Sequence, residues 1–365
     1  MLITLIIIIA LVVATYIFFN LPKFGKLPSG ARLERIKKSP NYRDGAFQNL
    51  NPTPSLAEGA SYSGVLKEFF FNRNQRLAPV DEIPSIKTDL LKLDKDKDIL
   101  VWFGHSSYFI QVDGRTILVD PVFSGAATPL PFGKRAFKGA DIYGVDDMPE
   151  IDYLFITHDH WDHLDYETII KLKLKVKQVI CSLGAGAHLE RWGYDMNKVV
   201  EKDWNEQVVL EDGFIVNTVP ARHFAGRGFT RNKTLWLSYV LQTPSMKIFL
   251  GGDSGYDTHF AMIGNAFGPF DLAILENGQY GRNWPYIHML PGQISKAARD
   301  LRAKRVLPVH SSKFALANHP WDEPLIRVAE DNKKENFGII TPMIGEPVNL
   351  KDNTQQFSEL WKGIN

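Results

Sequence analysis

The sequence predicts an α/β fold of layered strands and helices, and two observations carry this prediction. Short runs of β-branched and aromatic residues recur from Asp98 onward, as in buried strands, and helical stretches lie between and after them. The runs that we expect to form strands are Ile99–Phe103, Tyr108–Val112, Thr116–Val119, Tyr153–Ile156, Val176–Ile180, Phe214–Val219, Trp236–Leu241, Lys247–Leu250, Leu272–Leu275 and Val306–Val309. The stretches that we expect to form helices are Tyr166–Lys173, Gly186–Trp192 and Pro291–Leu301.

The composition is that of a globular protein and excludes several classes. Of the 365 residues, 44% are hydrophobic and 23% are charged. The net charge is +1, so no bulk positive field is available and we expect no nucleic-acid partner. The single cysteine, Cys181, excludes an intramolecular disulfide and a cysteine-rich zinc site. Any bound metal must therefore be held mainly by His, Asp and Glu.

The first 22 residues form an uncharged apolar run. Leu2 to Phe19 consists almost wholly of aliphatic and aromatic residues, and about 20 residues at about 1.5 Å each span a bilayer core. A cleaved signal peptide is the alternative, but it needs a basic start and small residues at its cleavage site. No Lys or Arg precedes the run, and its end is bulky. We therefore expect a retained single-pass anchor.

Basic residues follow the anchor and predict its orientation. They are Lys23, Lys26, Arg32, Arg35, Lys37 and Lys38. Positive residues tend to stay in the cytoplasm, so the rest of the chain is expected to face the cytoplasm. We expect four parts: a transmembrane anchor over 1–22, a stem and N-terminal extension over 23–96, a folded domain over 97–347 and a C-terminal tail over 348–365. The second part is rich in Pro, Asn and Ser, with short aromatic patches such as Phe69–Phe71.

A dense group of metal-binding residue types follows the expected strand Tyr153–Ile156. The segment reads Thr157-His158-Asp159-His160-Trp161-Asp162-His163. Imidazole and carboxylate groups are ligands for zinc and similar divalent ions. His158 and His160 can converge on one ion from an extended turn, and Asp162 and His163 can turn toward a second. A polar loop that is merely rich in histidine is the alternative, and the apolar strand directly before the motif disfavours it.

Three further ligand types occupy similar places in the chain. His223, Asp253 and His310 each lie at or just past the end of an apolar run. Strands that end on a common edge can bring such residues together. The glycines around Asp253 allow close approach of the backbone, and a carboxylate there can bridge two ions. A single histidine at such a position is more often packed in a core, but the shared placement favours ligands.

These motifs resemble those of the metallo-β-lactamase superfamily, over about Ile99 to Pro347. The resemblance implies a four-layer αββα fold with two divalent metal ions, zinc first, with iron and manganese as alternatives. It assigns His158, His160 and His223 to the first ion and Asp162, His163 and His310 to the second. Asp253 is implied as the bridge. Asp120 matches the structural aspartate that the superfamily places near the metal loop.

Within the superfamily, the sequence is most similar to two groups: N-acylphosphatidylethanolamine phospholipase D and the bacterial L-ascorbate-6-phosphate lactonases. The segments that carry the similarity are Trp102–Ser107, Gly252–Tyr256 and His310–Ala317. It implies a membrane-anchored phosphodiesterase of phospholipase D type whose partners are a phospholipid or another amphiphilic substrate and the membrane. A lactonase or other hydrolase of a small soluble phosphorylated substrate is the alternative. A metal-stabilised membrane adaptor without activity is a third hypothesis, and a homodimer stays open.

The resemblance also implies roles beyond metal binding. Hydrolysis would use a water shared between two ions, and Asp162 would orient that water or relay its proton. His288 matches a histidine near the substrate in the phospholipase group, so we expect it to act as an acid or to bind phosphate. His105 is expected to support a metal ligand rather than to be one. His188, His259 and His319 have no motif context.

Overall fold

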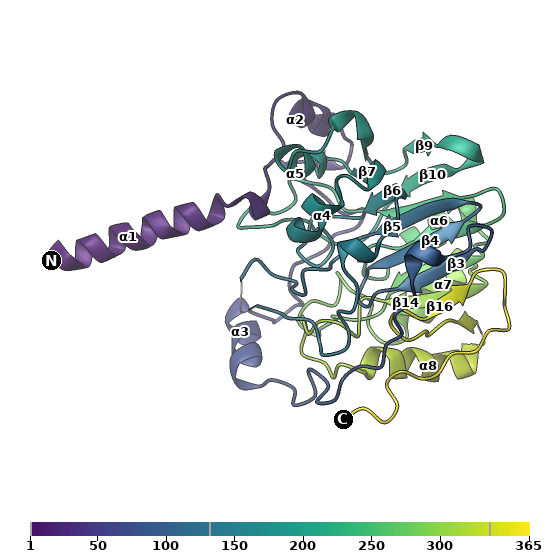
Figure 1. The fold of residues 1–365 in the computed structure, drawn as a ribbon. Coiled ribbons are helices and arrows are strands. Elements are labelled where there is room, and N and C mark those ends of the chain that lie inside the picture. Colours follow the sequence, from purple (N-terminus) through teal and green to yellow (C-terminus); the bar gives the residue numbers. More distant parts are fainter. Residues whose placement is uncertain (1, 131–132, 336) are drawn as a thin grey trace.

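Two seven-stranded mixed sheets form the centre of the molecule in the computed structural model, which describes residues 2–130, 133–335 and 337–365 (Figure 1). One sheet has the order β16-β3-β4-β5-β6-β7-β8 and the other the order β15-β14-β13-β12-β11-β10-β9. Helices flank both sheets, so the expected α/β class is confirmed. Chain segments that leave the strand ends carry most of the motif residues of the sequence.

The first sheet begins with antiparallel hairpins and continues with parallel strands. Its pairs β16–β3, β3–β4 and β4–β5 are antiparallel, and β5 to β8 are parallel. Parallel neighbours need crossover connections, and two of these contain the helices α4 (Tyr166–Leu172) and α5 (Gly186–Arg191). The strands are β3 (Ile99–Trp102), β4 (Tyr108–Val112), β5 (Arg115–Val119), β6 (Ile151–Ile156), β7 (Val176–Ser182), β8 (Val199–Lys202) and β16 (Pro347–Asn349).

The second sheet has the same design. Its strands are antiparallel from β9 to β12 and parallel from β12 to β15. The helices that connect or follow its parallel strands are α6 (His259–Phe267), α7 (Gln293–Leu301) and α8 (Glu323–Glu335). The strands are β9 (Gln207–Val209), β10 (Ile215–Val219), β11 (Ser238–Gln242), β12 (Lys247–Leu250), β13 (Leu272–Glu276), β14 (Arg305–Val309) and β15 (Gly338–Ile339).

Strand β6 shows how the core is divided between the two sheets. Its side chains alternate: Tyr153 and Phe155 belong to the main core, and Leu154 and Ile156 pack in a second cluster with Ile169 of α4. All six residues of β6 are buried, as expected for a central strand that is covered on both faces. The backbone that follows β6 is therefore held firmly where the histidine-rich motif begins.

The N-terminal helix α1 (Leu2–Phe19) projects from the body, to the left in Figure 1. Among the described helices it alone is long and apolar enough to cross a membrane, and none of its length is buried in the protein. An anchor and a signal sequence share these properties. Aromatic contacts join the end of the helix and the residues after it to the domain. Between ring centroids, Phe19 lies 4.4 Å from Phe229, and Phe24 lies 5.1 Å from Trp161.

Residues 23–96 wrap around the domain instead of standing apart as a stem. Ile36, Phe47 and Ile83 are buried in the main core. Scattered apolar residues between turns reach the core at sites that are distant in sequence, which composition alone does not indicate. The elements of this part are α2 (Gly30–Lys37), β1 (Tyr42–Arg43), β2 (Ala46–Phe47) and α3 (Tyr62–Phe71).

The C-terminal residues also belong to the folded body. Strand β16 extends to Asn349, and Leu360 and Trp361 are buried in the main core, so the boundary at 347 is not a structural one. Short 3₁₀ turns complete the fold: η1 (Pro22–Phe24), η2 (Leu90–Lys92), η3 (Val145–Asp147), η4 (Met196–Lys198) and η5 (Glu211–Gly213).

Candidate metal centre

The first group of site residues consists of His158, His160, His223 and Asp253, brought together from three strand ends. His158 Nε2 lies 2.9 Å from His160 Nδ1, and His223 Nε2 lies 3.2 Å from the same atom. Asp253 Oδ2 lies 3.8 Å from His158 Nε2 and 3.7 Å from His223 Nε2. Four potential ligand atoms thus surround one small volume.

Hydrogen bonds behind this group set which nitrogen faces inward. The Ile287 carbonyl can only accept, so His223 carries its proton on Nδ1, at 2.9 Å from that oxygen. Thr157 donates its hydroxyl to the Asp120 carboxylate, so His158 Nδ1, at 3.0 Å, donates to the Thr157 oxygen. The inward Nε2 atoms of His158 and His223 therefore carry no proton and present lone pairs, which metal ligation requires.

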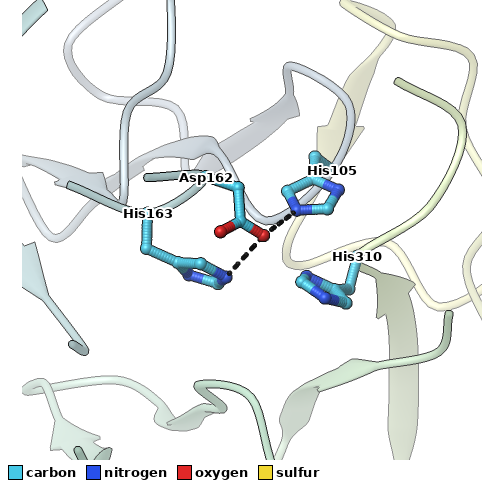
Figure 2. A group of neighbouring side chains, drawn as sticks. All are labelled: His105, Asp162, His163 and His310. Carbon is cyan, nitrogen blue, oxygen red and sulfur yellow. Dashed lines mark hydrogen bonds and ion pairs between the residues drawn. The ribbon is translucent and has the colours of Figure 1, made fainter. Parts of the chain in front are cut away.

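The second group consists of His105, Asp162, His163 and His310 (Figure 2). The Asp162 carboxylate lies between two rings, with Oδ2 at 2.9 Å from His105 Nε2 and 3.6 Å from His163 Nε2. His163 Nδ1 donates to Asp120 Oδ2 at 2.8 Å, so Nε2 is the nitrogen of His163 that faces inward. One buried carboxylate, Asp120, thereby orients ligands of both groups.

Asp253 lies between the two groups. Its Oδ2 is 3.2 Å from His163 Nε2, and its Oδ1 is 3.1 Å from His310 Nδ1. This is the place that a bridging carboxylate requires. The glycines before it allow the close approach, because a Cβ at Gly251 would lie 2.4 Å from the Ile274 oxygen and one at Gly252 would lie 2.7 Å from the Leu237 oxygen.

The donor set fits divalent cations. Nitrogen and oxygen ligands of a tetrahedral zinc ion lie about 2.0–2.2 Å from the metal and thus about 3.3 Å from one another. Four of the six distances between the inward atoms of the first group are 2.9 to 3.8 Å, which brackets that value. Two lone pairs and a carboxylate cannot satisfy one another, so they need a positive charge between them. The buried His and Asp clusters indicate a dinuclear metal site.

The electrostatics of the centre favour cations for the same reason. Burial lowers the pKa of His158, His223 and His310 well below the usual range, so these rings are neutral ligands. Burial also acts to lower the pKa of His163, but Asp253 and Asp162 outweigh it and raise that pKa well above its usual value. The carboxylates therefore attract positive charge, whether as a proton or as a metal ion.

His105 contacts Asp162, and its role as a support rather than a ligand stays a prediction. His105 and His310 both adopt positive φ, at 53° and 67°. His310 N donates to the His105 carbonyl, and His105 N donates to the Ser311 carbonyl, each at 2.9 Å. This reciprocal pair ties the loop after β3 to the loop after β14 and stabilises two costly backbone conformations.

Glu276 is a site residue that the sequence reasoning missed. It ends β13, is buried, and places Oε1 3.6 Å from Nδ1 of His288. Its position at the end of an apolar strand, like those of Asp253 and His310, was the available signal. The His288 ring lies 5.0 Å from His223 and 5.1 Å from His310. Burial raises the pKa of Glu276 to about 6.

The remaining histidines bond elsewhere, in line with their lack of motif context. His188 lies 3.1 Å from Asp159. His259 bonds Ser254, and His319 accepts from the Gln279 amide.

A cavity of about 430 Å³ opens above the two groups. Its floor holds His160, Asp162, His223, Asp253, His288 and His310. One wall is apolar and comes largely from α3 and the loops that face it: Leu56, Tyr62, Val65, Phe69, Trp284 and Leu316. Arg231 is the one Lys or Arg among the described residues that line the cavity. The cavity therefore joins a metal-binding floor to an apolar wall.

Comparison with known proteins identifies the family. A family model described as the beta-lactamase superfamily domain matches residues 115–311, which include both groups except His105. The chain belongs to the metallo-β-lactamase superfamily. A Mycobacterium tuberculosis relative, described as uncharacterized protein Rv0906, is 35% identical over 317 residues, or 86% of this chain and 85% of its own length. The superfamily resemblance of the sequence is thus confirmed.

Two other similarities bear on activity and fold. A Caenorhabditis elegans protein named N-acyl-phosphatidylethanolamine-hydrolyzing phospholipase D 1 is 27% identical over 267 residues, or 67% of this chain and 74% of that protein. The solved structure of Igni18, a metallo hydrolase from Ignicoccus hospitalis, aligns with a TM-score of 0.54 at 20% identity, over 69% of this chain and 97% of that one. Family and centre together make this protein a metal-dependent hydrolase.

Proposed function

We propose that the protein is a membrane-anchored phosphodiesterase of phospholipase D type, acting on N-acylphosphatidylethanolamine-like lipids. The observation that carries the proposal is the cavity, whose floor is the metal centre and whose wall is the apolar side of α3. A phospholipid has the matching division, because its phosphodiester is anionic and its acyl chains are apolar. The similarity to the C. elegans phospholipase D supports the same substrate class.

The residues divide the binding of such a lipid between them. Arg231 lies at the cavity with its guanidinium 4.7 Å from the centroid of the Phe224 ring, which holds the cation over an apolar surface. A guanidinium in this place can pair with a phosphodiester oxygen. Val65, Phe69 and Leu316 offer an apolar surface for the acyl chain that the amide nitrogen carries.

The two groups would hold two divalent ions, and we propose zinc. Such a pair, when bound, activates water at neutral pH and withdraws charge from phosphoryl oxygens. His158, His160 and His223 would hold one ion, Asp162, His163 and His310 the other, and Asp253 would contact both. Burial acts to raise the pKa of Asp162, but His163 and His105 lower it, so the carboxylate is ionised. Asp162 would accept a hydrogen bond from the attacking water and orient it.

His288 would supply the proton for the leaving group. Burial acts to lower the pKa of His288, but the adjacent Glu276 carboxylate outweighs burial and raises it. A protonated ring beside His223 and His310 can donate to the ethanolamine oxygen as its bond to phosphorus breaks. Glu276 acts here as a positioning residue through His288.

The test uses the full chain, loaded with zinc and mixed with vesicles that contain N-acylphosphatidylethanolamine. We expect equimolar N-acylethanolamine and phosphatidic acid, loss of turnover on chelation, and recovery when metal is restored. A preparation with two bound ions that releases neither product, with zinc, iron or manganese, would contradict the proposal. A fold that stays intact without metal and shows no activity on any phosphoester would favour the adaptor hypothesis.

A second candidate is a hydrolase of a small soluble phosphorylated substrate, such as a lactonase. The cavity volume of about 430 Å³ favours it, since this lies near the lower end of the usual range for ligand sites. The two candidates differ in their dependence on vesicles. Turnover of a water-soluble substrate that is faster than turnover of the lipid, and indifferent to vesicles, would select the second.

The location is part of the proposal. We propose that α1 is retained as a single-pass anchor and that the catalytic domain faces the cytoplasm, because the residues after the helix are basic. Protease added to intact cells should then leave the domain uncut and should cut it after lysis. A mature chain that lacks residues 1–19 by mass spectrometry would show instead that α1 is a signal sequence.

A further inference from the structure

Helix α3 carries large apolar side chains that are mostly exposed instead of packed against the domain. Tyr62 is 63% exposed, Leu66 57% and Phe70 73%. They are spaced four residues apart, so they lie on one side of the helix. Phe71, 80% exposed, follows at the C-terminal end. A soluble surface rarely carries so many large apolar groups together.

An adjoining strip of α3 is fixed to the mouth of the catalytic cavity, and Tyr62 belongs to both the strip and the exposed side. Val65 and Phe69 line that cavity, and Phe69 stacks on Trp284 at 6.2 Å between ring centroids. Glu68 accepts hydrogen bonds from the side-chain amides of Asn283 and Asn318 at 2.7 and 2.9 Å. The exposed side is therefore held in place, and it belongs to the same helix as the cavity wall.

Further exposed apolar residues lie between α3 and the base of α1. Lys134 lies 5.2 Å from the Phe69 ring, and Lys23 donates to the Pro129 carbonyl, so the segment near Pro129 lies between the two helices. Leu130 in this segment is 50% exposed, and Phe229, which packs on Phe19, is 84% exposed. In Figure 1, α1 and α3 lie on the same side of the body. We call Tyr62, Leu66, Phe70, Phe71, Leu130 and Phe229 the apolar face.

Basic residues accompany the apolar face. Lys67 lies on α3, Arg73 follows the helix, and Lys23 follows α1. Apolar side chains flanked by Lys and Arg are typical of segments that lie in the interface of an anionic membrane. A second copy of the chain would instead need groups complementary to these cations.

We propose that the apolar face inserts into the bilayer that α1 spans, so that α3 lies in the membrane interface and the cavity opens at the lipid surface. Phe229 of the apolar face packs on Phe19 at the end of the proposed anchor α1, and this contact favours a bilayer over other occupants. The inference rests on the proposed function in taking α1 as an anchor, and it adds the route by which substrate enters. Lipid would pass along α3 directly from the bilayer to the metal centre.

The first test measures the environment of α3 in the full chain, reconstituted in vesicles. A fluorescent nitrobenzoxadiazole label is placed at Leu66→Cys and, as the matched control, at Val209→Cys, which is 72% exposed on β9. The native Cys181 is buried and should not react. We expect the label at 66 to shift to the blue and to be quenched by lipids brominated on the acyl chains, and the label at 209 to do neither.

Two results of this test would overturn the proposal. If the labels at 66 and 209 show the same aqueous emission and no quenching, α3 stays in water. A blue shift at 66 that brominated lipids do not quench, and that persists in detergent, would place a second copy or another protein on the face. Both results are independent of whether the enzyme cleaves lipid.

The second test links the face to turnover. The double variant Leu66→Glu with Phe70→Glu alters exposed side chains only, and α1 still anchors the chain. We expect turnover of vesicle-embedded substrate to fall about tenfold, with a short-chain soluble analogue unaffected. If the wild type and the double variant turn over vesicle-embedded substrate equally fast, the insertion of the apolar face is contradicted and the proposed function stands. If the wild type is inactive on the lipid, the proposed function is contradicted. The fluorescent labels at positions 66 and 209 would then still show whether the apolar face inserts into the bilayer.

Discussion

The floor and the wall of the catalytic cavity are built in opposite ways. In the metal centre that forms and underlies the floor, His158, His163 and His223 each have one nitrogen held by a hydrogen bond, so the other nitrogen has a defined direction. The wall from α3 is apolar, and the outer side of this helix is not covered by other parts of the described chain. From this difference we expect hydrolysis to depend on the polar floor and choice of substrate to depend on the apolar wall.

The largest expected effect comes from removing the carboxylate that joins the two halves of the floor. Asp253→Asn should abolish metal pairing and lower turnover by about a thousandfold or more, since the charge between the two groups is lost. Metal analysis by inductively coupled plasma mass spectrometry, together with turnover, checks this. Asp212→Asn, on an exposed carboxylate, is the matched control. A fully active Asp253→Asn variant with two ions would sink the dinuclear assignment.

A smaller loss is expected one layer behind the floor. Asp120 accepts from His163 and from Thr157, which in turn fixes His158. Asp120→Asn weakens these contacts, so we expect metal affinity to fall about 10- to 100-fold. Titration against a competing chelator measures the affinity. Unchanged affinity for both ions would mean that the rings are oriented without Asp120.

The next effect concerns Glu276 and the proton on His288. Glu276→Gln removes the charge that raises the pKa of His288, so the protonated ring is lost at a lower pH. We expect kcat to fall about tenfold at neutral pH, with its high-pH limb moved to lower pH and the metal content unchanged. Glu330→Gln, on the surface of α8, is the control. A lower kcat with an unmoved pH profile would reduce Glu276 to a structural role.

The smallest effect is expected at the wall. Phe69→Ala removes a ring that stacks on Trp284. We expect KM for a long-chain lipid to rise about three- to tenfold, and kinetics on a short-chain analogue to stay the same. Leu174→Ala, at a residue that is 94% exposed, serves as the control. Equal losses on both substrates would show that the wall also supports the floor.

The floor could be predicted from the sequence far better than the wall. The motif from His158 to His163 follows a strand so apolar that its end was recognisable, and His223, Asp253 and His310 share that placement. A local pattern of this kind can be recognised in the sequence because several metal-binding residue types crowd within a few positions. Metal binding by these residues stays a prediction until ions are measured.

The wall could not be predicted because its contacts are distant in sequence. Phe69–Phe71 was visible only as an aromatic patch in an expected stem, and the partners of α3, Trp284 and Asn318, lie more than 200 residues away. Arg32 in the expected stem also has a distant partner, because it pairs with Glu201, 169 residues away, at 2.8 Å. Helices α6 and α8 were missed for the same reason, since their burial depends on the second sheet. Glu276 was overlooked because a lone acidic residue has no motif.

The measurement that tests the central claim most directly is hydrolysis of N-acylphosphatidylethanolamine in water enriched in ¹⁸O, with the full zinc-loaded chain. Attack of water on phosphorus at the metal floor predicts phosphatidic acid that carries one ¹⁸O in its phosphate, and N-acylethanolamine that carries none. Label in the N-acylethanolamine, release of a fatty acid, or absence of both products would contradict a phosphodiesterase of phospholipase D type.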